Sequence, residues 1–197
     1  MNHAALILAS GSPRRRELLS LTGLPYVVDA PEVDESCALP PEEAVQEISR
    51  RKGLAGAAAH PGCVVLSADT LVAVDGKALG KPHSEEEAFQ MLSLLSGRWH
   101  QVYTGVCAVD AQGMVHQRVV GTQVHFCPMT EEEIRRYIAT GEPMDKAGAY
   151  GIQGPAAVFV KRVEGCCFTI IGMPMHKLYH MLAKVGIYPD WQRAART

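Results

Sequence analysis

The sequence predicts an α/β fold: a mixed, strongly twisted sheet with flanking helices, in two lobes around a cleft. In the first half of the chain, short apolar runs typical of buried strands alternate with helical patterns. In the second half, two longer strand patterns, 101–109 and 115–126, are joined by a turn and predict an antiparallel pair. With 197 residues the chain can bury one sizeable core, so we expect a single domain over 1–197.

The first strand and helix meet at a small-residue turn. An apolar run at 6–9 predicts a buried strand, Ser10-Gly11-Ser12 predicts the turn, and Pro13 suits the first position of a helix over 13–22 with Ser12 as its N-cap. Arg14, Arg15 and Arg16 then stand at a helix N-terminus, where cations are unfavourable unless an anion offsets them. We therefore predict an anion site here, against the simpler interpretation of a plain connection with solvated arginines.

An acidic loop and a second helix follow the short strand at 26–28. The loop over 29–41 contains the acidic run 32–35, which alone would be a solvated turn. The helix, expected over 41–58, places Lys52 on a mostly apolar stripe, where a lysine usually extends its amine towards water. We expect Arg50 and Arg51 to be solvated.

A buried strand over 63–69 ends in Asp69, a placement typical of catalytic carboxylates in α/β proteins. An extended run at 71–74 and the Asp75-Gly76 turn predict a hairpin that returns to Lys81. Asp69 and Lys81 are thus expected to lie near each other, although Asp69 could instead serve as a cap or an ion-pair partner.

The rest of the chain is predicted to supply helices, a hairpin and a ligand-approaching loop. Capping boxes at Ser84 and Thr130 begin two helices, and Pro174 begins the last one. The glycine-rich stretch 144–154 is a loop that lets backbone approach a ligand. Runs at 157–160 and 167–170 predict a second hairpin, and the tail after Pro189 is expected to fray. His176 and His180 have zinc-ligand spacing, but no third ligand accompanies them.

Three stretches resemble the Maf family of nucleotide pyrophosphatases, and the likeness extends to about Leu182. They run from Leu6 to Leu19, from Ser67 to Pro82 and from Glu142 to Gly154. The resemblance implies that Asp69 is the general base and that Lys52 and Lys81 share the catalytic site with it. The implied substrate-binding residues are Ser10, Ser12, Arg14, Arg15, Thr70 and Gln153. The implied metal ligands are Asp34, Glu35 and Asp69.

The residue types in this set suit hydrolysis of a nucleoside triphosphate. Clustered carboxylates would repel a triphosphate unless a divalent cation, Mg²⁺ or Mn²⁺, lies between them. Water activated by a carboxylate would attack the α-phosphorus and release pyrophosphate. Arg14, Thr70 and Gln153 resemble the family branch that acts on dTTP and UTP, whereas the branch acting on 7-methyl-GTP carries Trp, Gln and Glu there. Modified pyrimidine nucleotides are further candidate substrates.

The composition and net charge limit the classes of partner that the protein is expected to bind. The net charge of −2 gives no general attraction to nucleic acid or anionic membranes, and no apolar run is long enough to span a bilayer. Six cysteines without a C-x-x-C pair suit a reducing cytosol, and no signal peptide is indicated, so we expect a cytoplasmic protein. The resemblance implies a homodimer. Two other functions stay open: a nucleotide-sensing regulator of septum formation with little turnover, and nucleic-acid binding through the basic runs 14–16 and 50–52.

Overall fold

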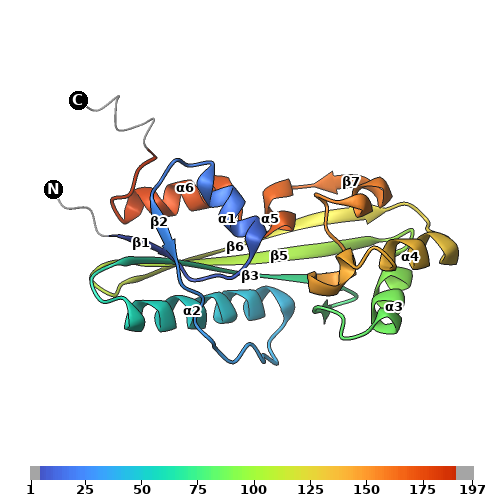
Figure 1. Ribbon diagram of the computed structural model, residues 1–197, viewed down its shortest axis with the longest axis horizontal. Coiled ribbons are helices and arrows are strands. Elements are labelled where there is room, and N and C mark those ends of the chain that lie inside the picture. Colours follow the sequence, from blue (N-terminus) through green and yellow to red (C-terminus); the bar gives the residue numbers. More distant parts are fainter. Residues whose placement is uncertain (1–4, 190–197) are drawn as a thin grey trace.

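A mixed sheet forms the centre of the protein, which is described here as a computed structural model covering residues 5–189 (Figure 1). The strands follow the order β2-β1-β3-β5-β6-β7, and β4 pairs with β3 beyond the end of β1. β1 is parallel to β2 and β3, and the remaining pairs are antiparallel. The strands are β1 (Leu6–Leu8), β2 (Tyr26–Val28), β3 (Val64–Val74), β4 (Lys77–Leu79), β5 (Trp99–Val109), β6 (Val115–Phe126) and β7 (Val160–Glu164).

Helices cover both faces of this sheet. α2 lies along one face, α1 and α6 lie on the opposite face, and α3 and α4 gather at the far end (Figure 1). The helices are α1 (Pro13–Ser20), α2 (Pro41–Ala59), α3 (Glu85–Leu95), α4 (Glu131–Ile138), α5 (Cys167–Ile171) and α6 (Met175–Lys184). Three short 3-10 helices lie between α4 and β7: η1 (Glu142–Asp145), η2 (Ala147–Ala149) and η3 (Pro155–Phe159).

The hydrophobic core confirms the expected two lobes on one sheet. One cluster packs α1 and α6 against β1 and the first half of β3, around Leu19, Leu66 and Leu182. A second cluster packs α3 and α4 against the second half of β3 and the ends of β5 and β6, around Leu92 and Phe126. The long strands β3 and β5 pass through both lobes, because each of them contributes residues to both clusters.

The predicted hairpin between 157–160 and 167–170 is wrong. β7 pairs with β6 instead, and residues 167–171 form the helix α5. The chain turns at Gly165, whose φ of +126° favours glycine, and the Thr122 hydroxyl then bonds both the N–H and the C=O of Cys166. These contacts turn the backbone away from β7. A short apolar run cannot by itself distinguish a strand from a buried helix.

The structure also bears on the chain's tail, on possible membrane spans and on the cysteines. The predicted fraying of the tail after Pro189 lies outside the described residues. Among residues 5–189, every helix is too short or too polar to cross a membrane. All six cysteines are free thiols.

A buried histidine packs in the lobe that contains α3 and α4. His100 on β5 is 3% exposed, and its Nε2 lies 2.8 Å from the hydroxyl of Tyr150, which lines the cleft described below. Burial lowers the pKa of His100 to about 4. The unfolded chain therefore binds more protons than the folded one between about pH 4 and 6.5, so the folded protein loses stability as pH falls through that window.

Replacing His100 with Gln is expected to flatten this part of the pH dependence. The His100 contribution amounts to about 3 kcal/mol across the window, from the size of the pKa shift. Urea denaturation at pH 4.5, 5.5, 6.5 and 7.5 measures the free energy of unfolding of each protein. His83→Gln, at an exposed position, should keep the wild-type slope. Equal slopes for wild type and His100→Gln would show that His100 is not the group responsible.

Candidate active site

A cleft of about 900 Å³ opens beside the middle of β3. β1 pairs with β3 only as far as Leu66, and β4 begins to pair at Val72, so the strand between them has a neighbour on the β5 side alone. Loops from both lobes surround this open edge. The lining includes nearly all the predicted site residues: Ser10, Ser12, Arg14, Arg15, Glu35, Lys52, Asp69, Thr70, Lys81 and Gln153.

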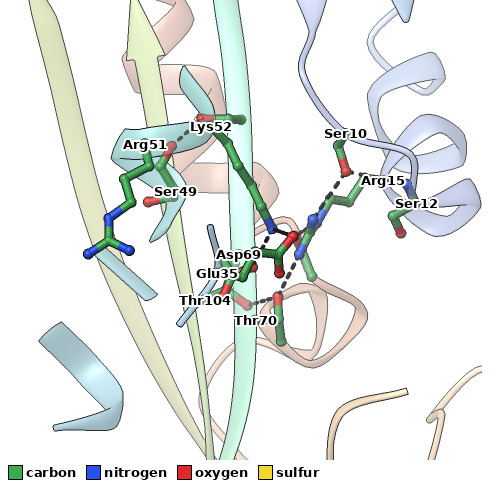
Figure 2. Close-up of polar contacts among 12 residues, drawn as sticks. Ser10, Ser12, Arg15, Glu35, Ser49, Arg51, Lys52, Asp69, Thr70 and Thr104 are labelled. Carbon is green, nitrogen blue, oxygen red and sulfur yellow. Dashed lines mark hydrogen bonds and ion pairs between the residues drawn. The ribbon is translucent and has the colours of Figure 1, made fainter. Parts of the chain in front are cut away.

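A lysine joins two carboxylates on the α2 side of the cleft (Figure 2). The Lys52 Nζ lies 2.8 Å from Asp69 Oδ1 and 2.9 Å from Glu35 Oε1. Asp69 is 6% exposed, whereas the Glu35 side chain is largely exposed. Because Lys52 satisfies a buried charge, it does not extend towards bulk water as a surface lysine would.

Close packing of α2 on the sheet lets Lys52 reach Asp69. Gly105 lies directly opposite Asp69 in the β3–β5 pair, and a Cβ there would lie only 2.3 Å from the backbone oxygen of Val45 in α2. A Cβ on Gly53 would lie 2.9 Å from the sulfur of Cys107 on β5. Two glycines therefore permit a helix–sheet approach that larger residues would prevent.

Arg51 positions the acidic loop. Its Nη1 donates to the backbone oxygens of Asp34 and Ser36, at 3.1 and 2.9 Å, and its Nε donates to Glu47. The expectation of a solvated Arg51 is thus wrong, and Arg50 also bonds Glu47. The backbone that carries Glu35 is held between these two contacts.

Asp34 lies apart from the cleft lining. Its carboxylate accepts from the backbone N–H of Ser36 at 2.8 Å. Hydrogen bonds from the Ser36 side chain and from this N–H lower the pKa of Asp34. The carboxylate shapes the loop next to Glu35, while its predicted role as a metal ligand stays a prediction.

Arg15 is a partly buried cation held by neutral groups. Its Nε donates to the Gly172 oxygen at 3.0 Å, its Nη1 to Ser10 Oγ at 3.1 Å and its Nη2 to Thr70 Oγ1 at 3.2 Å. Burial lowers its pKa. Among residues 5–189 it forms no direct ion pair, although Asp69 and Glu35 act on it through space. A partly buried cation without an acidic partner favours an anion in the cleft.

The turn before α1 differs from the prediction in one detail. Ser12 occupies the N-cap position, but its hydroxyl forms no capping bond; its N–H instead donates to Ser10 Oγ at 3.3 Å. Ser10, which is buried, accepts from both Ser12 and Arg15. Ser10 therefore shapes the turn, and the Ser12 hydroxyl is left to face a ligand.

The opposite wall of the cleft comes from the glycine-rich stretch. Asp145 accepts from Arg14 Nη1 at 3.3 Å and from Lys146 Nζ at 2.7 Å. The N–H of Gly148 donates to the oxygen of Gly80 at 2.9 Å, which joins this stretch to the segment carrying Lys81. The predicted proximity of Asp69 and Lys81 holds to the extent that both line the same cleft.

A chain of hydroxyl groups leads from the cleft to α5. Thr70 Oγ1 lies 2.9 Å from Thr104 Oγ1, and the Thr104 hydroxyl donates to the Thr169 oxygen at 2.7 Å. Ile170 and Ile171 of α5 line the cleft. No feature of the sequence indicates a role for Thr104. Because the sequence pattern predicts a strand over 167–170, it also does not predict the cleft wall that α5 forms.

The carboxylates suit a magnesium-type ion better than a closed metal centre. Glu35 and Asp69 both contact the Lys52 ammonium, so the two carboxylates lie close together at the cleft. Within the described part of the chain, no group of three or more His, Cys, Asp and Glu side chains could hold a metal. Mg²⁺ is commonly held by one or two protein carboxylates with phosphate oxygens and water completing its shell, and these residues fit that pattern.

Together these features define an α/β protein with a cation-lined, anion-binding cleft. The sequence matches the Maf-like protein family over residues 5–185, and the chain belongs to that family. It is 50% identical over 188 residues to a dTTP/UTP pyrophosphatase of Symbiobacterium thermophilum, covering 93% of this chain and 95% of that protein. It is 47% identical over 186 residues to the dTTP/UTP pyrophosphatase of Bacillus pumilus, covering 93% and 98%.

The fold also resembles a solved structure of lower sequence identity. A HAM1 protein from Coxiella burnetii aligns with a TM-score of 0.50 and 14% identity, covering 92% of this chain and 99% of that one. At this identity the likeness concerns the fold.

Proposed function

We propose that this protein hydrolyses dTTP and UTP to the nucleoside monophosphate and pyrophosphate, with water attacking the α-phosphorus. The observation that carries the proposal is a cleft in which the predicted cations and carboxylates of a Maf-type site line one hollow, in a chain about 50% identical to relatives named dTTP/UTP pyrophosphatase. Modified pyrimidine nucleotides remain candidate substrates of the same cleft.

The roles of the residues follow from their charges and contacts. Asp69, buried and bonded through one oxygen to Lys52, accepts the proton of the attacking water through its carboxylate. Lys52, Lys81 and Arg14 offset phosphate charge, and the partly buried Arg15 adds a fixed positive field. Thr70 and Gln153 contact the base, for which the Gln amide offers both a donor and an acceptor.

A divalent cation, Mg²⁺ or Mn²⁺, belongs to this proposal. Glu35 and Asp69, which both line the cleft, are the residues that would hold it. When bound, the ion supplies charge neutralisation on the phosphates. A cytoplasmic location is proposed from the free thiols of all six cysteines. The homodimer, and the absence of nucleic-acid or membrane partners, stay predictions.

Purified protein is expected to release pyrophosphate from dTTP and UTP faster than from GTP, ATP or 7-methyl-GTP. A coupled assay that counts pyrophosphate at a fixed Mg²⁺ concentration measures this, and excess EDTA should abolish the release. A flat profile across the five nucleotides would defeat the pyrimidine preference. Tight binding of dTTP with no pyrophosphate released would favour a nucleotide-sensing regulator instead.

A further inference from the structure

In the chain of hydroxyl groups at the cleft, the donor and the acceptor of each hydrogen bond can be assigned. Thr104 has a single hydroxyl proton, and that proton is donated to the Thr169 oxygen, which can only accept. The 2.9 Å contact between Thr70 and Thr104 must therefore use the Thr70 proton. Arg15 Nη2 donates to Thr70 as well. One lone pair of the Thr70 oxygen is left, so this hydroxyl can only accept from a ligand.

The surroundings of Thr104 hold the Thr70 hydroxyl in this acceptor-only state. It is fully buried, and it lies opposite Thr70 in the β3–β5 pair. Its partner Thr169 is also fully buried, and Arg15, which contacts Thr70, bonds Gly172 just beyond α5. Thr70 is thus held between two neighbours whose own hydrogen bonds do not permit it to rotate its proton towards the cleft.

The position of Thr70 suits a base more than a phosphate. Successive side chains of a strand point to opposite faces, so Asp69 meets Lys52 on the α2 side while Thr70 faces α1 and α5. Apolar side chains line the cleft on that side, among them Ile170 and Ile171. An acceptor-only hydroxyl would also repel phosphate oxygens. A nucleobase that contacts Thr70 must therefore present a donor.

We propose that Thr104 is a specificity-determining positioning residue, which makes Thr70 an obligate acceptor for the N3–H of uracil or thymine and so disfavours cytosine. This inference rests on the proposed function. Uracil and thymine carry one N–H on the base, at N3, whereas N3 of cytosine is an acceptor. When two acceptors face each other, neither lone pair receives a proton. This unsatisfied contact weakens the binding of the cytosine nucleotide.

Removing the Thr104 hydroxyl tests the proposal. In Thr104→Val the Thr70 proton is released and can be donated to N3 of cytosine. The ratio of kcat/KM for UTP over CTP is expected to fall by about tenfold or more, the scale of one buried hydrogen-bond partner. Thr104→Ser keeps the hydroxyl and should keep the ratio. Thr22→Val removes a hydrogen-bonded hydroxyl after α1 that bonds the Leu19 oxygen and lies outside the cleft lining, and it should also leave the ratio unchanged.

A double-mutant cycle separates positioning from general damage. If Thr104 acts through Thr70, Thr70→Val and the double variant Thr70→Val/Thr104→Val should have the same UTP/CTP ratio. An unchanged ratio in active Thr104→Val, or an equal shift in both backgrounds, would overturn the proposal. Should Thr104→Val fail to fold, wild-type protein still decides: hydrolysis of CTP or of N3-methyl-UTP as fast as UTP would contradict it. Wild type that hydrolyses none of these nucleotides would remove the proposed function together with this inference.

Discussion

Asp69→Asn is expected to lower kcat for dTTP by about 10²–10⁴-fold, the range typical of a lost general base, while the protein stays folded. Asn has nearly the same shape as Asp, and its carbonyl oxygen can still accept from Lys52, which lies 2.8 Å from Asp69. The amide, however, cannot take a proton from water. The variant also removes one negative charge from a cleft that binds an anion, so nucleotide affinity measured without a divalent cation should be unchanged or tighter.

Pyrophosphate release and equilibrium nucleotide binding should therefore separate in this variant. The thermal unfolding midpoint and calorimetric titration with a non-hydrolysable dTTP analogue measure folding and binding alongside kcat. Asp75→Asn is the matched control, because Asp75 forms an exposed ion pair with Arg98 in the β3–β4 turn, and Asn tolerates its positive φ of 51°. The control should behave as wild type. Near-native kcat in Asp69→Asn would remove Asp69 from the mechanism.

Arg15→Lys is expected to damage both stability and substrate binding, although it keeps the positive charge. A lysine ammonium cannot reach the three separate partners that the planar guanidinium bonds, namely Ser10, Thr70 and Gly172. Losing two such charge-assisted bonds should lower the free energy of unfolding by about 2–4 kcal/mol. The β1–α1 turn and Thr70 lose their common support, so kcat/KM for dTTP should fall by about tenfold to a hundredfold.

The next residue on the same helix supplies the control. Arg16 is exposed, and Arg16→Lys should leave the free energy of unfolding within about 0.5 kcal/mol of wild type. Urea denaturation and steady-state kinetics on the three proteins measure both effects. A wild-type denaturation midpoint for Arg15→Lys would show that its buried hydrogen bonds contribute nothing to the fold.

The predictions from local pattern were the ones that the structure matched most closely. The strand at 26–28 and the Asp75-Gly76 hairpin agree with the structure, and the helix expected over 41–58 is observed as Pro41–Ala59. Each depends on periodicity, capping or turn chemistry within a few residues. The prediction for 167–170 failed because its apolar run suits either secondary structure, and the contact of Thr122 with Cys166, 44 residues away, decides between them.

In the site, too, residue types could be predicted from the sequence, whereas their contacts could not. The residue types expected around a nucleotide were identified from the sequence, and nearly all of them line the cleft. Their individual partners were not predictable. Arg51 looked solvated but supports the acidic loop. Arg15 looked like a plain phosphate ligand but bonds Gly172, Ser10 and Thr70 at the cleft, and Thr104 carried no signal.

By itself, then, the sequence determined the strand–helix order as far as α4, the family resemblance and the residue types that line one cleft, because these depend on residues close together in the chain. Only the tertiary structure decided which polar group bonds which, and therefore which protons are available to a substrate. Those choices depend on distances between residues as far apart as Arg15 and Gly172 or Thr70 and Thr104, and such distances are fixed by packing.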